Sequence, residues 1–327
     1  MNPTNNNLRR VLSVVIALAV FCPVLVSAQV PARFYWKSLA GANAVPIIYQ
    51  NIGGNANPLD PAHLVSPEAE IDAEVAVAGF AKMLPVFGRT ATLAALVPMG
   101  RLSSAVNAAG EYAAESSRGF GDPMVELGLN LIGPKAIMGI PDLLRYEPKF
   151  SLDVITDIMF PIGEYDSDQA LNLGQNRWYG RVGAPVVWQL GAWVPGRRTT
   201  LEVLPSVWWF ADNDDYVGET LSTDPMFQLE GHLTRDLTET LWASLDSTWM
   251  TGGQATVGDG EEGDSLDNLG AGFTLGYQVN DNLAFTCGYM ATVNDSEPTD
   301  LQLDGFRISL TYGWHKIIEG QKRLPAE

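Results

Sequence analysis

The chain has 327 residues and a formal net charge of −18, from 38 acidic and 20 basic side chains. Only 18% of the residues are charged, 46% are hydrophobic and nine are tryptophan, a composition too apolar for a disordered chain. The acidic balance and the lack of a Lys- or Arg-rich run argue against a nucleic-acid partner.

The first 28 residues have the parts of a cleavable signal peptide. Two arginines, Arg9 and Arg10, precede a long apolar run, and small residues lead up to Gln29. We expect cleavage between Ala28 and Gln29, which leaves residues 29–327 as one domain. A membrane-anchoring helix is the alternative, but the apolar run is short for a span and is broken by a proline.

Beyond the signal, the hydrophobic side chains follow a period of two. In the segment that ends at Trp314, Phe306, Ile308 and Leu310 alternate with small or polar residues such as Ser309. Period two puts the two sets on opposite faces of a β-strand. Segments of about ten residues fit a tilted membrane strand better than a soluble strand, which commonly has about five or six residues.

Twelve segments of this kind follow one another along the chain. They lie near residues 44–51, 70–83, 88–99, 121–132, 149–160, 177–190, 198–210, 225–234, 240–251, 267–279, 282–293 and 303–315. Long links alternate with short ones, as in outer-membrane barrels, which also have an even number of strands. The link 133–148 is too long for a turn, and we interpret it as either a helical turn or a mispaired strand. The pattern predicts an all-β, transmembrane, antiparallel up-and-down barrel of about 12 strands.

Four of the long links are strongly acidic. Residues 161–176, 211–224, 252–266 and 294–302 carry fifteen Asp and Glu and no Lys or Arg. Runs of like charge are most often a solvated rim. Divalent-cation binding is the functional alternative, although Asp212, Asp214 and Tyr216 lack the full ligand set and the glycine of a calcium loop.

The tryptophans fall into two groups by parity. Those predicted to face lipid near strand ends, where the amphipathic ring suits the membrane interface, are Trp178, Trp188, Trp209, Trp249 and Trp314. Trp208, Phe210 and Trp242 have the opposite parity and are predicted to point inward. They either form an aromatic constriction for a hydrophobic solute or fill the interior of a narrow barrel.

The same parity places charged side chains in the interior. The acids predicted to face the lumen are Asp72, Glu74, Glu126, Asp153, Asp157, Glu202, Glu230 and Asp246, opposed by Arg181 and Arg307. Such an acidic interior is expected to prefer cations. The candidate solute path combines some of these charges with His232 and the inward aromatic residues: Arg181, Glu202, Trp208, Phe210, Glu230, His232, Trp242, Asp246 and Arg307.

An enzyme is the least favoured interpretation. His232 is predicted to lie near Glu230 and Asp246 as a general base pair, but a hydrogen-bond network inside a barrel is commoner. After signal removal one cysteine, Cys287, is left, which excludes an internal disulfide and a Cys-rich zinc site. No nucleotide-phosphate loop, dinucleotide fingerprint or zinc-protease motif occurs, so we expect no catalytic site, metal or cofactor.

Several segments resemble one known family. They are RGFGDPMVELGLNLIGPKA at 118–136, FPIGEYDSDQALNLGQNRW at 160–178, VWWFADNDDYVG at 207–218 and LWASLDSTWMTGG at 241–253, with further similarity in FYWKSLAGANAV and FGRTA. Over nearly its whole mature length, the chain is similar to the family described as "MetA-pathway of phenol degradation, putative", whose members are regarded as outer-membrane transporters. The resemblance implies a β-barrel associated with uptake of aromatic or other hydrophobic compounds.

We therefore expect a barrel in the outer membrane of a Gram-negative-type bacterium, in contact with membrane lipid. The first hypothesis is a passive channel for small hydrophobic or aromatic solutes, since no energy-coupling segment is visible. The second is a structural or surface-binding barrel with a plugged lumen and acidic loops that contact cations.

Overall fold

The computed structural model describes residues 30–36, 38–67, 69–108, 111–138, 142, 146–297 and 299–315. The predicted signal peptide and the cleavage site between Ala28 and Gln29 lie outside this part of the chain. Among the described residues, no helix is long and apolar enough to cross a membrane.

The elements with defined bounds in the described part of the chain are all strands. Their bounds are β1 (Ala42–Gly54), β2 (Ala69–Val86), β3 (Arg89–Ala108), β4 (Glu111–Phe120), β5 (Met124–Ile132), β6 (Phe150–Met159), β7 (Tyr179–Gly183), β8 (Val186–Gln189), β9 (Thr199–Phe210), β10 (Asn213–Tyr216), β11 (Glu219–Thr223), β12 (Met226–Asp236), β13 (Leu241–Gly252), β14 (Ala255–Val257), β15 (Leu266–Gln278), β16 (Leu283–Thr292) and β17 (Leu303–His315).

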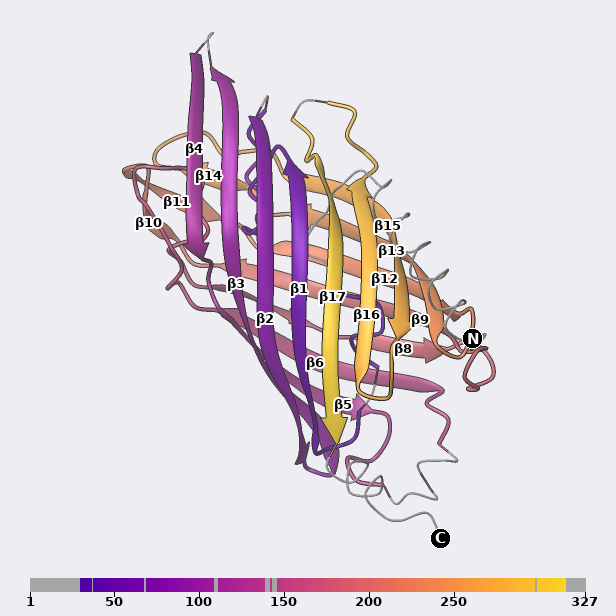
Figure 1. Ribbon diagram of the computed structural model, residues 1–327. Coiled ribbons are helices and arrows are strands. Elements are labelled where there is room, and N and C mark those ends of the chain that lie inside the picture. Colours follow the sequence, from indigo (N-terminus) through magenta and orange to yellow (C-terminus); the bar gives the residue numbers. More distant parts are fainter. Residues whose placement is uncertain are drawn as a thin grey trace.

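Most of these strands form one closed antiparallel barrel (Figure 1). The order runs from β1 through β2, β3, β5, β6, β7 and β8, β9, β12, β13, β15 and β16 to β17, which pairs with β1 over thirteen register positions. Strands β7 and β8 both pair with β6 and β9 and are two halves of one strand. Pro185 separates them, because proline has no N–H for the ladder. With these halves taken together, the barrel has the twelve strands that the sequence predicts.

The alternation of the sequence fixes which side chains face the membrane and which face the interior. Trp178, Trp188, Trp209 and Trp249 are 37–54% exposed on the outer wall, as their parity predicts. The opposite set is buried inside the barrel, where Thr200, Thr234 and Thr274 have at most 1% exposure. A period of two is therefore enough to define the lipid-facing surface over most of the wall.

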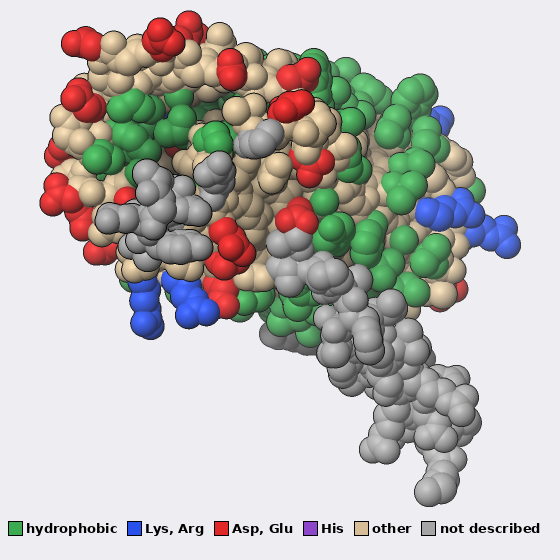
Figure 2. All heavy atoms as spheres, turned by 90° about the horizontal axis from the view of Figure 1, so that it is seen from above, with side chains coloured by type: hydrophobic (Ala, Val, Ile, Leu, Met, Phe, Trp, Pro, Cys, Tyr) green, Lys and Arg blue, Asp and Glu red, His purple; other side chains and the backbone are tan. Residues whose placement is uncertain are grey.

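The two ends of the barrel differ. Tight turns join the strands at one end, for example at Phe87–Gly88, where both residues have positive φ as a type I′ turn requires. Long loops lie at the other end, where Asp and Glu side chains gather and Lys and Arg side chains are few (Figure 2). We call these the short-turn end and the long-loop end.

Three of the long links contain more structure than the sequence predicts. The predicted strand 88–99 continues as β3 to Ala108, and β4 pairs with this extension in a hairpin that projects beyond the barrel (Figure 1). The acidic links 211–224 and 252–266 contribute β10, β11 and β14, which form a separate small sheet. Small residues such as Ala and Ser dominate the hairpin, so its sequence carries no hydrophobic alternation to predict it.

The link 133–148 is described only in part. Its described residues belong to no strand, so no mispaired strand is found there, and the helical turn stays a prediction.

Candidate solute path in the barrel interior

The structure places the nine side chains of the predicted solute path inside the barrel. Arg181, Glu202, Trp208, Glu230, His232, Asp246 and Arg307 are each at most 9% exposed, and Phe210 and Trp242 are half-buried. Along the barrel axis the interior divides into three layers: an apolar layer at the long-loop end, a charged layer in the middle, and a chain segment that enters from the short-turn end.

The apolar layer is built from the strand ends nearest the long loops and from the loops themselves. Its buried members are Ile52, Ala56, Ile71, Ala73, Val75, Leu102, Met159, Leu171, Leu173, Tyr179, Trp208, Met226, Met250, Leu266, Leu301 and Leu303. Phe210 packs against this layer and stacks on Tyr179 with ring centroids 6.5 Å apart. A polar barrel interior is the usual arrangement, so this apolar layer is a departure from it.

The loops 55–67 and 160–178 cover this layer and are fastened to each other. Arg177 donates two hydrogen bonds through Nη2 to the carboxylate oxygens of Asp60, at 3.0 and 2.9 Å. This ion pair is buried. Asn57 donates its side-chain amide to the carbonyl of Asn172 at 2.8 Å. His63 is also buried in the loop, and burial lowers the pKa of its imidazole below the usual value. The cover is thus a packed element rather than a loose rim.

The charged layer consists of two buried clusters. Arg181 bonds Asp157 through Nε at 2.5 Å and Glu230 through Nη1 at 2.8 Å. His232 Nδ1 lies 2.7 Å from Asp246 Oδ1 on the neighbouring strand β13. Charges buried at this depth persist only when they are paired, and removal of one partner is costly.

Hydroxyl groups complete the second cluster. Ser244 Oγ donates to Oδ1 of Asp246 at 2.5 Å, and Thr274 Oγ1 donates to Oδ2 at 2.6 Å. Both hydroxyls therefore point at the carboxylate and not at His232, so neither is placed as a nucleophile activated by that histidine. The arrangement matches a structural hydrogen-bond network.

Residues 30–36 lie inside the barrel and contact the charged layer, and no pattern in the sequence predicts this. Glu230 Oε2 accepts the backbone N–H of Val30 at 2.9 Å. Glu202 accepts the backbone N–H of Arg33 and the indole N–H of Trp36, both at 2.8 Å. Acids that were predicted to face the lumen thus hold a segment of the chain itself.

Arg33 is the central anchor of this segment. Its guanidinium forms an ion pair with Asp236 at 2.8 Å and lies between two indole rings, 4.2 Å from the centroid of Trp36 and 4.4 Å from that of Trp242. The ring of Trp36 also packs against that of Trp193, with the two ring centroids 4.9 Å apart. Guanidinium groups stack well on indole faces, and burial strengthens the attraction. The only sequence feature that points to this role is an aromatic and basic cluster placed between the predicted signal peptide and β1.

Two predicted lumen acids are on the wrong side of the wall. Asp72 and Glu74 face outward, and the inward positions of β2 at this level are Ile71, Ala73 and Val75. Here β2 has passed beyond the apolar belt, so the outer face meets water while the inner face packs into the apolar layer. Polar side chains therefore face the interior only at the depth where the outer face of the wall meets lipid.

The possible cation sites at the acidic loops find no support. Within the described part of the chain, no three His, Cys, Asp or Glu side chains come together in a group that could hold a metal ion.

Comparison with known proteins identifies the family. The COG4313 outer membrane channel from Pseudomonas putida F1 superposes with a TM-score of 0.68 at 19% identity, covering 87% of this chain and 99% of that one. The transport unit of the autotransporter AIDA-I from Escherichia coli superposes with a TM-score of 0.49 at 7% identity, covering 86% and 93%. Among curated proteins, no sequence match was found. The family model described as "Putative MetA-pathway of phenol degradation" matches residues 49–310, and the chain belongs to this family.

Proposed function

We propose that this protein is a passive outer-membrane channel for small hydrophobic or aromatic solutes, which pass through the interior of the barrel. The observation that carries the proposal is the apolar layer at the long-loop end, where Trp208, Met226 and Met250 are each at most 4% exposed. When the covering loops 55–67 and 160–178 move aside, a solute meets a hydrophobic surface there and leaves water favourably. The outer wall, with its apolar belt and interfacial tryptophans, supports a place in the outer membrane.

The segment 30–36 is proposed as the element that closes this path at the short-turn end. Its bonds to the barrel are mostly polar, so they can be exchanged for water or for solute contacts without unfolding the barrel. The aromatic faces of Trp36 and Trp242, now stacked on Arg33, would then be free to contact a passing ring. The acids of the charged layer would disfavour a carboxylate, so neutral aromatic compounds are the better cargo.

Liposome swelling with a panel of neutral solutes tests the proposal. The wild type is compared with Met226→Gln, which places an amide in the apolar layer, and with Leu245→Gln as a control on the outer wall, where Leu245 is 67% exposed. We expect Met226→Gln to slow the entry of apolar solutes relative to sugars of similar size, and Leu245→Gln to leave this ratio unchanged. Equal ratios for all three proteins would refute a path through the apolar layer.

A structural or surface-binding barrel is the second candidate. It is favoured by the interior itself, which is filled at one end by the loops 55–67 and 160–178 and at the other by residues 30–36. The two candidates differ when the segment is removed: a channel gains permeability, whereas a structural barrel stays closed.

A further inference from the structure

On the outer wall over β1 to β4, the side chains change from apolar to polar between two neighbouring rows of paired residues. The row nearer the short-turn end consists of Tyr49, Ala76, Met99 and Phe120, of which Tyr49, Met99 and Phe120 are 42%, 37% and 58% exposed. The next row consists of Asn51, Glu74, Arg101 and Arg118. Two residues of a strand span about 7 Å, so the apolar belt ends and a polar surface begins within that distance.

The two arginines of the polar row are exceptional at this end of the molecule. The four acidic loops there carry no Lys or Arg, and the remaining arginine of the long loops described by the structure, Arg177, is buried against Asp60. The exposed cations of this end thus lie side by side on adjacent strands, on a protein whose net charge is −18. Nonspecific attraction of an anion to such a surface is not expected.

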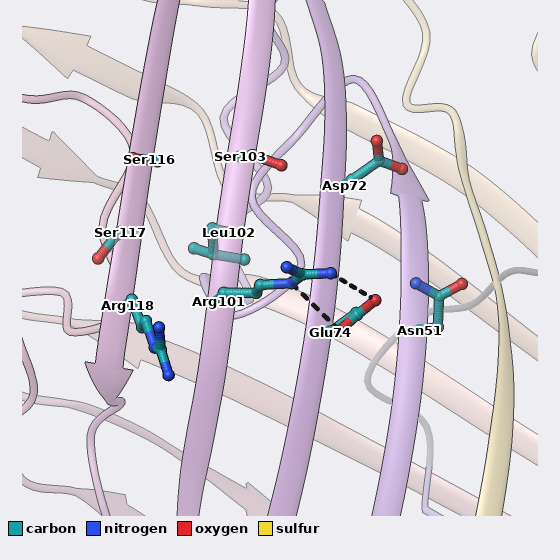
Figure 3. A pocket seen from close by; sticks show the side chains of 9 residues that line it. All are labelled: Asn51, Asp72, Glu74, Arg101, Leu102, Ser103, Ser116, Ser117 and Arg118. Atoms are coloured by element: carbon teal, nitrogen blue, oxygen red, sulfur yellow. Dashed lines mark hydrogen bonds and ion pairs between the residues drawn. The ribbon is translucent and has the colours of Figure 1, made fainter.

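Arg101 and Arg118 border a hollow of about 570 Å³ in the outer face of this sheet (Figure 3). Arg101 donates two hydrogen bonds to Glu74, at 3.1 and 2.9 Å, and its side chain stays 67% exposed. Arg118 has no ion-pair or hydrogen-bond partner among the described residues. Hydroxyl groups of Ser103 and Ser116 lie one row further from the apolar belt, on the same face.

We propose that this hollow binds the phosphate group of a phosphorylated glycolipid in the outer leaflet of the membrane. The guanidinium of Arg118 offers several N–H donors in a geometry suited to phosphate, and Arg101 offers a second such group. Ser103 and Ser116 supply neutral hydroxyl donors. The exposed rings and thioether of the row below, from Tyr49, Met99 and Phe120, are placed to contact the acyl chains of the same molecule. A free phosphate ion would gain nothing from that apolar row, which is why the lipid is the ligand.

The acids of the hollow fit this assignment. Glu74 is engaged by Arg101 and holds that guanidinium over the hollow, and Asp72 lies on the side away from the apolar belt (Figure 3). A phosphate bound beside Arg118 would draw Arg101 partly away from Glu74. The site is therefore expected to strengthen when Glu74 loses its charge.

Native mass spectrometry of the folded protein in detergent tests the proposal, with bis-phosphorylated lipid A as the probe. The variants are Arg118→Ala, Arg101→Ala with Arg118→Ala, and Glu74→Gln. Lys82→Ala is the matched control, because Lys82 is an exposed, outward-facing cation on β2 at the short-turn end. Each variant is checked for folding by its heat-modifiable gel migration.

We expect the lipid-bound fraction to fall at least fivefold in Arg118→Ala, to fall further in the double variant, to rise in Glu74→Gln and to stay unchanged in Lys82→Ala. Dephosphorylated lipid A should bind no better to the wild type than to the double variant. Equal binding by the wild type and the double variant would overturn the proposal. Complete displacement of the lipid by inorganic phosphate would also overturn it, since the site would then be an anion site without lipid specificity.

Discussion

Two ion pairs in this protein have the same chemistry and different surroundings. Arg177 and Asp60 join two loops and are buried, whereas Arg101 and Glu74 lie on the outer wall in solvent. Loss of one partner leaves an uncompensated charge only in the first pair. The position of a pair, and not its geometry, therefore decides what its removal does.

We predict that Arg177→Ala destabilises the cover by about 3–5 kcal/mol, because Asp60 is left buried without its partner. Thermal unfolding followed by gel migration, and limited proteolysis of the loops 55–67 and 160–178, measure the effect. Arg101→Ala is the comparison and should leave both readouts at the wild-type value. Equal losses in the two variants would show that the loops are not fastened by the buried pair.

His63 makes the cover sensitive to acid. Burial lowers the pKa of His63 in the folded state below the value of about 6.5 found in an unfolded chain. The neutral imidazole therefore stabilises the fold above that value, and the contribution is lost as the pH falls through the folded pKa. We predict faster proteolysis of the loop 55–67 at pH 5 than at pH 7.5, and a smaller pH effect in His63→Gln. Identical pH dependence in the variant would exclude His63 as the cause.

At the scale of the elements, the sequence was most informative where strands cross the lipid. Hydrophobic and polar side chains alternate there because the lipid-facing side excludes charged side chains, whereas the interior accepts charged side chains that are paired. All twelve wall strands and the inward set that includes Glu202, Glu230 and Asp246 could be predicted for this reason. The broken strand was still found as one segment, since β7 and β8 share a single alternating pattern across Pro185.

Prediction failed where that constraint ends. Asp72 and Glu74 were assigned to the lumen although β2 has already left the lipid at their level, and the hairpin of β3 and β4 has no alternation at all. Residues 30–36 were invisible because they form no strand: their place is set by long-range bonds to Glu202 and Glu230, some 170 to 200 positions away along the chain. No local pattern encodes such contacts.

The wall of β15 offers a direct check of which face meets lipid. Phe273 is 39% exposed near the middle of β15 and packs against Tyr289. We predict that Phe273→Arg costs about 2–4 kcal/mol, because it places a charge in the hydrocarbon, and that it lowers the refolding yield in lipid vesicles. Thr286→Arg is the inward control and should be milder. Thr274 is unsuitable for this purpose, since it is buried and donates to Asp246. Similar losses at Phe273 and Thr286 would contradict the assignment of faces.

At the scale of the whole molecule, charge is sorted by position. Acids crowd the long-loop end, and the interior holds more acids than arginines even after Asp72 and Glu74 are assigned to the outside and Arg33 is added. An open barrel is therefore predicted to prefer cations. Reversal potentials in a potassium chloride gradient measure this preference, which should weaken in Glu202→Gln and Glu230→Gln. An anion-selective reversal would refute it.

The central proposal is that the barrel interior is the path and that residues 30–36 close it at the short-turn end. Planar-bilayer conductance tests this claim most directly, with the wild type compared to a refolded chain that lacks residues 30–36. The bonds from Val30, Arg33 and Trp36 to Glu230 and Glu202 are absent in the shortened chain, so a larger and steadier conductance is predicted. If the two chains, both folded, conduct equally little or equally well, the segment is not the closing element and the claim is wrong.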